Sequence, residues 1–342
     1  MKAARMHRTG SPDVLVLEDA PDPKPGPGEV LIRVEAASVN FADAVRRRGD
    51  PYPYPSPPPF IPGGEVAGTV VAHGPGVSDP PIGSPVFALL GNGGAGGYAQ
   101  FATAPARQII PLPPPLDKDF DRACTLVIAG VTALQALRDC GRLAPGESVW
   151  IPAAAGGVGS YAVQIARALG AGKIIAGVGN LQKADFVRSL GAHEVVDYGA
   201  AGWTDRVKDL TGGRRVDLAL EMTGGPMFEQ TLSVLAPFGR MVVYGAASRE
   251  RAALEVPKLI PFNHTIVGYY VSDWFTQRPQ AAVDALTQLI DLIRSGRVDV
   301  QVGNVFPLAD AAAAHRVLEA RTSVGKIVLK PWRDVRDEPR AG

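Results

Sequence analysis

Cysteine and surplus charge are what the sequence has least of. Two of its 342 residues are cysteine, Cys124 and Cys140, and their spacing fits neither a CxxC motif nor a disulfide framework. A reducing, cytoplasmic setting is therefore expected. Lys and Arg together number 35 against 34 Asp and Glu, a formal net charge of +1. That balance argues against a nucleic-acid or anionic-membrane partner.

Long apolar runs are also missing. No segment is apolar over the length needed to cross a bilayer, and the start, MKAARMHRTG, lacks the apolar stretch of a secretory signal. The composition, 46% apolar and 20% charged, is that of a globular protein. A chain of 342 residues is longer than a domain built around one hydrophobic core usually is, so two domains are expected.

The first third of the chain is rich in short β-branched segments. Glu29–Ala36 and Val66–Ala72 are bounded by Gly or Pro and predict strands, and a helix is expected over Phe41–Arg47. The segment Pro51–Pro62 is too rich in proline for a helix or a central strand, so it predicts an extended surface loop. The glycine-rich stretch Gly91–Gly97 predicts a second, mobile loop.

Short β-branched runs alternate with helical runs from about Asp121 to His264. This alternation predicts an α/β fold, a doubly wound parallel sheet with helices on both faces. The expected strands are Ser148–Ile151, Lys173–Val178, Glu194–Val196, Val216–Leu220 and Arg240–Tyr244.

The last part of the chain predicts an amphipathic helix, Gln280–Arg294, and a further strand, Val302–Phe306. A helix over Ala309–Ala320 and a strand over Lys326–Leu329 are expected to follow. The polar tail from Trp332 onward is expected to fray.

A strand, a glycine turn, a helix and a second strand follow one another within Ser148–Asn180. Gly156 and Gly159 occupy the second and third glycine positions of the dinucleotide-binding fingerprint GxGxxG, and Ala154 occupies the first. Gly156 lets the backbone approach a pyrophosphate, and the helix N-terminus offers N–H groups to the phosphates. The segment therefore predicts a nucleotide site; the alternative is a flexible alanine-rich turn.

The end of the second strand distinguishes NADPH from NADH. An NAD enzyme usually places Asp or Glu there to hold the ribose 2′-hydroxyl, but this strand ends in Gly179 and Asn180. Lys183 follows, and its ammonium can pair with a 2′-phosphate. NADPH is therefore the expected cofactor, although a solvated helix lysine remains an alternative for Lys183.

Six segments together resemble the medium-chain dehydrogenase/reductase superfamily, and within it the zinc-free NADPH:quinone oxidoreductases related to zeta-crystallin. They are SVNFADAVRRRG (Ser38–Gly49), PGGEVAGTV (Pro62–Val70), AGVTALQAL (Ala129–Leu137), AAAGGVG (Ala153–Gly159), LGAHEVVDY (Leu190–Tyr198) and VGKIVL (Val324–Leu329). The resemblance covers nearly the whole chain.

The resemblance implies a Rossmann domain, residues 123–264, inserted into a β-rich, GroES-like substrate domain. That substrate domain is formed by residues 1–122 and by the chain from 265 to 342, with the active site in the cleft. The family usually forms homodimers by pairing edge strands, and Thr265–Val271 resembles that strand. The alternative is an internal strand of a monomer, since an apolar edge must be covered.

The resemblance also implies which residues contact the cofactor. Thr132, Tyr198, Gly245 and Ala246 match positions that contact nicotinamide, ribose or adenosine phosphate in the family. The full expected set is Thr132, Ala155, Gly156, Gly157, Val158, Gly179, Asn180, Lys183, Tyr198, Thr223, Gly245, Ala246, Tyr270 and Lys326.

Three positions that hold zinc ligands in metal-dependent relatives are occupied here by Asn40, Gly64 and Ile128. Their side chains cannot build a zinc site, which needs about three N, S or O ligands, and the four-cysteine structural zinc loop is also missing. No metal is therefore expected. Glu65, at the motif's acidic position, is expected to be structural.

A metal-free site lacks a Lewis acid, so the easiest acceptor is one that delocalises its own negative charge. We expect a quinone or an α,β-unsaturated carbonyl, with the protein donating hydrogen bonds to the developing oxyanion. Asn40 is the first candidate donor; its alternative role is a helix cap. Arg47 matches a family arginine, with a solvated helix arginine as the alternative.

The sequence offers two candidates for the proton donor. Val45 stands where related quinone reductases often carry Tyr, and valine cannot deliver a proton. Tyr52 and Tyr54, in the proline-rich loop, are candidates, with loop packing as the alternative. His315, in AAAAHRVLEA, is expected on a helix surface.

The sequence therefore predicts an NADPH-dependent, zinc-independent quinone or enone reductase. Two alternatives remain open: an enoyl-thioester reductase of fatty-acid or polyketide metabolism, and an NADPH-binding sensor or structural protein with little turnover.

Overall fold

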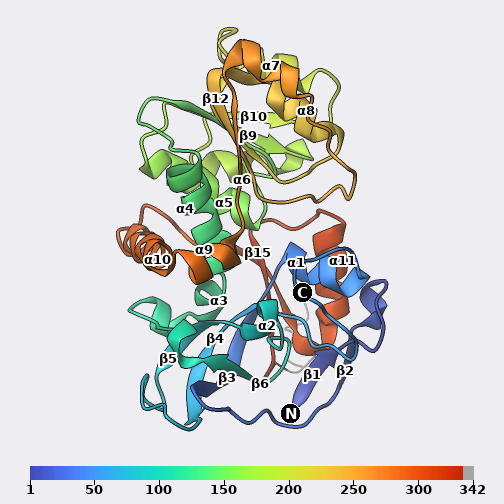
Figure 1. Cartoon of the computed structure of the whole chain (residues 1–342), viewed down its shortest axis with the longest axis vertical. Helices are drawn as coiled ribbons and strands as arrows, with labels where there is room; N and C mark the ends of the chain where they lie inside the picture. The colour runs from blue at the N-terminus through green and yellow to red at the C-terminus, as the bar shows by residue number, and fades with distance from the viewer. Residues whose placement is uncertain (334–342) are drawn as a thin grey trace, which may run out of the picture. The chain divides into compact units, whose positions relative to one another are not determined.

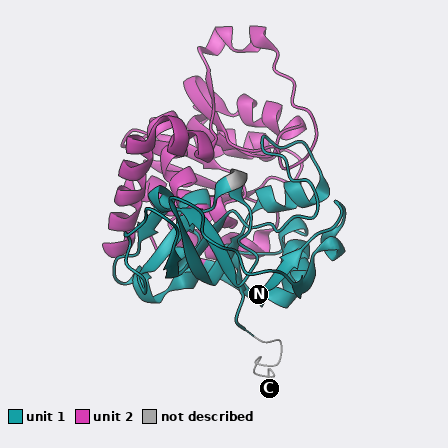
Figure 2. Cartoon of the chain, turned by 60° about the horizontal axis from the view of Figure 1, so that its bottom comes forward, with its two compact units in different colours: residues 1–128, 302–342 teal, residues 129–301 magenta. Residues whose placement is uncertain are grey.

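The computed structural model describes residues 1–333, apart from the side chains of residues 92 and 93. The chain folds into two compact units (Figure 2). Unit 1 comprises Met1–Ile128 and the chain from Val302, and unit 2, Ala129–Gln301, is inserted between them. These boundaries differ from 122 and 264, the ones expected from the sequence. The second boundary lies later because helix α10 (Pro279–Arg294) contacts α4 (Thr132–Gln135) within unit 2.

Unit 1 contains a seven-stranded sheet in the order β14-β15-β3-β4-β5-β7, with β6 also paired to β3. All neighbours are antiparallel except β14 and β15. The strands are β3 (Glu29–Val39), β4 (Glu65–His73), β5 (Pro85–Leu89), β6 (Phe101–Pro105), β7 (Ile109–Pro111), β14 (Val302–Pro307) and β15 (Lys326–Lys330). The strands predicted near residues 29–36, 66–72, 302–306 and 326–329 are confirmed.

Alternation of buried and half-buried residues explains β3. Val30, Ile32 and Val34 are fully buried, and the residues between them are partly exposed. A strand with period-two alternation places one face on the core, so this segment anchors the hydrophobic cluster of unit 1. The remaining strands and α-helices of the unit are β1 (Lys2–Arg5), β2 (Val16–Asp19), α1 (Phe41–Arg48), α2 (Gly91–Gly94), α3 (Phe120–Ala123) and α11 (Ala311–Glu319).

The two predicted loops of unit 1 differ in outcome. Pro51–Pro62 contains no helix or strand, only a single bridge between Phe60 and Met6, so this loop is confirmed. The stretch Gly91–Gly97 begins instead with the short helix α2. Backbone bonds from Gly96 N to Ile61 O (2.8 Å) and from Gly97 N to Gly63 O (3.1 Å) then tie it to the chain before β4.

Unit 2 contains a six-stranded sheet in the order β10-β9-β8-β11-β12-β13, and every neighbouring pair is parallel. The strands are β8 (Ser148–Ile151), β9 (Lys173–Val178), β10 (Glu194–Asp197), β11 (Val216–Glu221), β12 (Leu235–Val243) and β13 (Thr265–Gly268); Figure 1 labels β9, β10 and β12. The five strands expected from the alternating pattern are confirmed, β12 beginning five residues earlier than expected. The order reverses between β8 and β11, which is the switch point of a Rossmann sheet.

Helices connect β8 through β12 in turn, as parallel pairing requires. They are α5 (Gly157–Ala168), α6 (Ala184–Ser189), α7 (Trp203–Leu210) and α8 (Pro226–Ser233); α9 (Val271–Gln277) follows β13, and α4 and α10 also belong to the unit. Trp150 of β8 stacks on Trp203 of α7, with ring centroids 4.9 Å apart. This pair is part of the buried cluster that joins the sheet to its helices.

Two expectations near the C-terminal half need correction. The strand expected over Thr265–Val271 ends at Gly268, and Val271 begins α9. The tail expected to fray from Trp332 is ordered at that residue, whose indole N–H donates to Val34 O at 2.8 Å. Residues 334–342 of that tail lie outside the described part of the chain. Among residues 1–333, no helix has the length and apolarity needed to span a membrane.

Candidate cofactor and acceptor sites

The residues that follow the strands of unit 2 include most of those expected at the cofactor. Because all six strands are parallel, their carboxyl ends share one edge of the sheet, where such folds bind ligands. In strand order the residues are Ala155, Gly156, Gly157 and Val158 after β8, Gly179 and Asn180 after β9 with Lys183 just beyond, Tyr198 after β10, Thr223 after β11, Gly245 and Ala246 after β12, and Tyr270 after β13. Thr132, at the start of α4, and Lys326, in unit 1, are the exceptions.

The glycine turn after β8 is built for close packing. Gly156 is the N-cap of α5, which begins at Gly157. A Cβ at Gly159 would lie 2.2 Å from Ala153 O and 2.6 Å from Ala154 Cα, so only glycine fits there. The first N–H groups of a helix have no partner within it and carry partial positive charge. The turn therefore presents backbone donors at the carboxyl edge of the sheet.

The end of β9 offers no carboxylate of its own. Asn180 caps the 3₁₀ turn Leu181–Lys183, its Oδ1 accepting from Gln182 N at 2.8 Å. Lys183 is half-buried, and burial lowers the pKa of its ammonium. Asp197 lies opposite Val178 in the β9–β10 register, but its Oδ1 accepts from Gly199 N at 2.8 Å. The nearest strand-end carboxylate is thus engaged with its own loop.

Glu221 is a residue that the sequence analysis did not single out. It ends β11 and is fully buried. Its Oε1 accepts from Thr223 N at 2.8 Å and from Gly224 N at 3.1 Å, while burial raises the pKa of the carboxyl. This carboxylate therefore fixes the turn that carries Thr223. A carboxylate at the last position of the strand VDLALE, at the carboxyl edge of the sheet, was the available signal.

In unit 1, Asn40 lies in a buried cluster with Glu65 and Lys326. Its Nδ2 donates to Glu65 Oε1 at 3.1 Å, and its Oδ1 accepts from Lys326 Nζ at 2.6 Å. Asn40 occupies the N-cap position of α1, and its backbone N–H donates to Asp43 Oδ2 at 2.9 Å. The Asn40 amide itself points to the two charged groups.

Glu65 and Lys326 form a buried pair of opposite charge. Glu65 Oε2 accepts from Ile128 N at 2.9 Å, and Lys326 Nζ lies 3.8 Å from Glu65 Oε1. Burial raises the pKa of the Glu65 carboxyl and lowers that of the Lys326 ammonium. A buried pair of this kind stays charged only where the partner and the surrounding hydrogen bonds offset the desolvation. Lys326, expected at the cofactor, thus contacts Asn40.

The three positions of the absent zinc ligands come together in unit 1. A Cβ at Gly64 would lie 3.2 Å from Ile128 Cδ1 and 3.4 Å from Gly94 Cα. Asn40 and Ile128 bind the two oxygens of the same Glu65 carboxylate. An isoleucine side chain and a neighbouring backbone therefore fill the space around Gly64. The described residues contain no group of three His, Cys, Asp or Glu that could hold a metal ion.

The reading of Arg47 as a solvated helix arginine is wrong. Its side chain is fully buried and donates to Glu319 Oε1 at 2.6 Å, so it joins α1 to α11. Tyr52 is half-buried in the proline-rich loop, where the Arg46 guanidinium lies 5.3 Å from its ring centre. Tyr54 lies beside it, with ring centroids 6.4 Å apart.

His315 is not on the surface of its helix, so that prediction is wrong. The residue is fully buried, and its Nε2 lies 3.1 Å from the hydroxyl of Tyr98, which in turn donates to Asp43 Oδ2 at 3.2 Å. Burial lowers the pKa of His315 to about 3, and desolvation raises that of Asp43 to about 6. His315 is buried because it lies on the same face of α11 as Ala311 and Ala314, and this face packs in the core.

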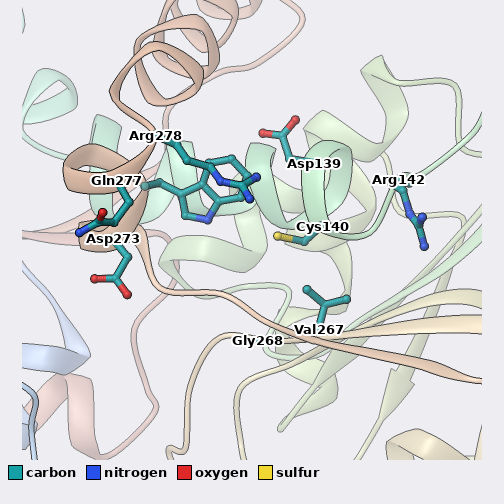
Figure 3. Close-up of a pocket in the computed structure, with 9 residues that line it drawn as sticks. Asp139, Cys140, Arg142, Val267, Gly268, Asp273, Gln277 and Arg278 are labelled. Carbon is teal, nitrogen blue, oxygen red and sulfur yellow. The ribbon is translucent and has the colours of Figure 1, made fainter.

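A surface pocket of about 510 Å³ lies elsewhere in unit 2. Figure 3 shows the Cys140 sulfur among side chains from α9 and from the turn before α10, with β13 along one side. Burial raises the pKa of the Cys140 thiol, which disfavours the thiolate. None of the residues expected at the cofactor lines this pocket. Its lining is Asp139, Cys140, Arg142, Val267, Gly268, Asp273, Trp274, Gln277 and Arg278.

Two family profiles match separate parts of the chain. Residues 26–114 match the alcohol dehydrogenase GroES-like domain, and residues 157–291 match the profile described as zinc-binding dehydrogenase. The first match lies in unit 1 and the second in unit 2. Together with the glycine turn they define a dehydrogenase in which a Rossmann-type domain is inserted into a GroES-like domain.

Full-length relatives narrow this class. A 2-haloacrylate reductase of a Burkholderia species is 34% identical over 331 residues, 96% of this chain and 98% of the relative. A quinone oxidoreductase of Pseudomonas aeruginosa is 33% identical over 322 residues, 94% of this chain and 97% of the relative. The crystal structure of Escherichia coli quinone oxidoreductase complexed with NADPH has a TM-score of 0.89 at 30% identity, covering 97% of this chain and 100% of that one. The chain therefore belongs to the medium-chain dehydrogenase/reductase family, as the resemblance predicted, and is an oxidoreductase.

Proposed function

We propose that the protein is an NADPH-dependent, zinc-independent reductase that transfers hydride to a quinone or an α,β-unsaturated carbonyl. The observation that carries the proposal is the carboxyl edge of the unit 2 sheet. That edge combines the tightly packed glycine turn with a β9 that ends in Gly179 and Asn180 instead of an acid. The relatives named above support the reaction class, since quinones and 2-haloacrylates are both conjugated acceptors.

The residues at that edge fit a reduced nicotinamide dinucleotide. The backbone N–H groups from Gly157 onward would bind the pyrophosphate, and Gly156 leaves room for it. Lys183 would pair with the 2′-phosphate, which no acid at the end of β9 would repel. When bound, the cofactor supplies the hydride; the protein binds it and orients it.

The acceptor must disperse its own charge, because the side chains of Asn40, Gly64 and Ile128 cannot hold a Lewis-acidic metal. We propose Asn40 as the hydrogen-bond donor to the oxyanion that develops on the acceptor. Tyr52 is the proposed proton source, since Val45 cannot fill that role. Arg47 is left out, because it is fully buried and paired with Glu319.

The second copy of the chain is the proposed partner. Strand β13 is the last strand of the sheet, so in the described part of the chain its outer edge has no neighbouring strand. Val256 and Ile260, in the segment that leads into β13, are 61% and 73% exposed. An open apolar edge of this kind is normally covered, and pairing with the same strand of a second copy would close it.

The cysteine usage supports a cytoplasmic location.

The test is turnover with a matched panel of acceptors. Oxidation of NADPH and of NADH is followed with a quinone, a simple enone, a 2-haloacrylate and an enoyl thioester. We expect turnover with NADPH on the quinone, the enone or the 2-haloacrylate. Turnover confined to the thioester would favour the acyl-chain reductase, and tight NADPH binding with no turnover would favour the sensor.

A single variant tests the preference for NADPH over NADH. Lys183→Ala is expected to weaken NADPH binding by about 1.5–3 kcal/mol at most, the value of a charge-assisted hydrogen bond, and less where water screens it. NADH affinity should stay within error, because NADH has no 2′-phosphate. Fluorescence titration of both nucleotides measures this, and an unchanged NADPH affinity would remove Lys183 from the site.

A further inference from the structure

We propose that Lys326 and Glu65 are positioning residues for Asn40, holding its amide so that one N–H remains for the carbonyl oxygen of the acceptor. The inference rests on the donor role of Asn40 in the proposed function. It adds two charged residues that would set the strength and the direction of that donor.

The two charges determine which way the Asn40 amide faces. The ammonium of Lys326 has only donors, so it selects Oδ1, 2.6 Å away. The carboxylate of Glu65 has only acceptors, so it selects Nδ2, 3.1 Å away. The flipped amide would place its NH₂ group against the ammonium and its oxygen against the carboxylate. Both contacts would be repulsive, which fixes the orientation.

The distances indicate that the Asn40 amide bridges the two charged groups by hydrogen bonds. Lys326 Nζ is 2.6 Å from Asn40 Oδ1 but 3.8 Å from Glu65 Oε1, beyond hydrogen-bond length. A pair that served only to stabilise the fold would gain most from direct contact. Here Asn40 is the group hydrogen-bonded to both.

One N–H of Asn40 remains weakly used. Nδ2 carries two donors; one goes to Glu65, and the other has Ser38 Oγ at 3.5 Å, the outer limit of a hydrogen bond. A cation on the amide oxygen polarises the amide and strengthens its N–H donors, and burial increases the effect. Lys326 would thereby supply, through Asn40, part of the polarisation that a metal supplies in zinc-dependent relatives.

Adjacent strands make the cluster rigid. Glu65 begins β4, Asn40 follows β3 and Lys326 begins β15, and β3 pairs with both other strands. Glu65, Lys326 and Asn40 are 0%, 4% and 5% exposed. Their other bonds include Ile128 N to Glu65 Oε2 at 2.9 Å, the Ser38 side chain to Glu65, and Lys326 Nζ to Val39 O at 3.4 Å, and these hold both groups in place. The other ionisable groups nearest the cluster are Asp43 and the Cys124 thiol.

The experiment is a double-mutant cycle on kcat, using the acceptor that the wild-type protein reduces. Asn40→Ala is expected to lower kcat by about 100-fold, as the loss of one oxyanion donor does. Lys326→Met removes the ammonium, keeps the stem, and should lower kcat by about tenfold or more. The double variant should be no slower than Asn40→Ala alone, because Lys326 acts through Asn40.

Further measurements separate positioning from a structural role. KM for the acceptor and the Kd of NADPH should change less than about twofold in Lys326→Met, since the lost interaction is made in the transition state. Lys330→Met, on the same strand but paired with Asp121, is the matched control and should keep its kcat. If Lys326→Met folds poorly because Glu65 is left without a cation, Lys326→Met with Glu65→Gln removes both charges and enters the cycle in its place.

The possible outcomes test the positioning role of Lys326 and Glu65 separately from the proposed reductase function. Wild-type turnover with full activity in Asn40→Ala would end the donor role of Asn40 and this inference with it. Loss of kcat in Asn40→Ala together with a further, multiplicative loss in the double variant would overturn the positioning role alone. Failure of the wild-type protein to turn over any acceptor would reject both.

Discussion

At the residue scale, the sequence was least informative about buried polar groups. Arg47 and His315 were both open to a reading as solvated helix residues, yet both are fully buried. Each depends on a partner from a distant segment, Glu319 for Arg47 and Tyr98 for His315. Local sequence cannot show that a polar side chain has such a partner, and a polar group without one would be too costly to bury.

The cluster around Asn40 could not be predicted from the sequence for the same reason. Glu65 was expected to be structural and Lys326 to lie at the cofactor, because each belonged to a separate motif. Their meeting at Asn40 depends on β15 pairing with β3, almost 290 residues apart in the chain. Motif spacing identifies which residue types are present, whereas the long-range register decides which of them meet.

His315 should make stability depend on pH. Its folded pKa of about 3 lies below the ordinary 6.5, so between those values the unfolded chain binds more protons than the folded one. The stability contributed by keeping His315 neutral is therefore complete above about pH 6.5 and is lost as the pH falls toward 3. At pH 4.5 the loss amounts to roughly 2–3 kcal/mol.

His315→Leu removes this titration. The variant is expected to be less stable than the wild type at pH 7.5, and the difference in the free energy of unfolding should shrink as the pH falls to 4.5. Asp43, whose folded pKa of about 6 acts in the opposite direction, is common to both proteins and largely cancels. Urea unfolding at several pH values measures the difference, with the exposed His7→Gln as control. A difference that stays constant with pH would contradict the assignment.

At the element scale, periodic segments were predicted well and glycine-rich or boundary segments poorly. The strands and helices of unit 2 follow from alternating apolar runs that tertiary contacts do not override. The segment Gly91–Gly94 has no periodicity at all, and its helical turn is held by backbone bonds to the chain before β4. The chain leaves β13 at Gly268, although Tyr269 and Tyr270 still have strand-like residue types.

The turn between β8 and α5 gives an element-scale prediction. A methyl group at Gly159 would meet Ala153 O at 2.2 Å and Ala154 Cα at 2.6 Å, both backbone atoms. Helix and strand would have to separate, so Gly159→Ala should destabilise the protein by about 1–3 kcal/mol. It should also weaken NADPH binding, because the N–H groups of α5 move with the helix.

Thermal unfolding and a nucleotide titration measure the two effects. Gly91→Ala is the matched control, since the nearest atom to its Cβ is Pro105 Cδ at an ordinary 3.8 Å. A Gly159→Ala variant with the wild-type melting temperature and NADPH affinity would show that the turn is looser than its backbone contacts indicate.

At the scale of the whole molecule, the interrupted order of the units came from the family resemblance and not from periodicity. Periodicity marks where strands and helices lie, but it does not indicate that Val302 onward rejoins the first 128 residues. Residues 265–301 show the limit of the resemblance. They stay with unit 2, because β13 pairs with β12 and α10 contacts α4.

The edge of the unit 2 sheet predicts the oligomeric state. Strand β13 pairs with β12 on one side, and the bond from Tyr269 N to Val243 O shows that alternate N–H groups face away from β12. In a twofold dimer this strand would run antiparallel to its own copy, so a residue near the centre of the strand would lie close to the same residue of the partner. A lysine introduced there would therefore meet a like charge across the interface and destabilise it.

Val267→Lys should accordingly shift the protein from dimer to monomer in sedimentation velocity, at concentrations where the wild type remains dimeric. Val267 also borders the pocket in Figure 3, so the added side chain has open space and need not disturb the core. Val16→Lys, at a 49% exposed position of β2 in unit 1, is the matched control and should leave the oligomeric state unchanged. A monomeric wild type, or a Val267→Lys variant that remains dimeric at low concentration, would place the interface elsewhere or remove it.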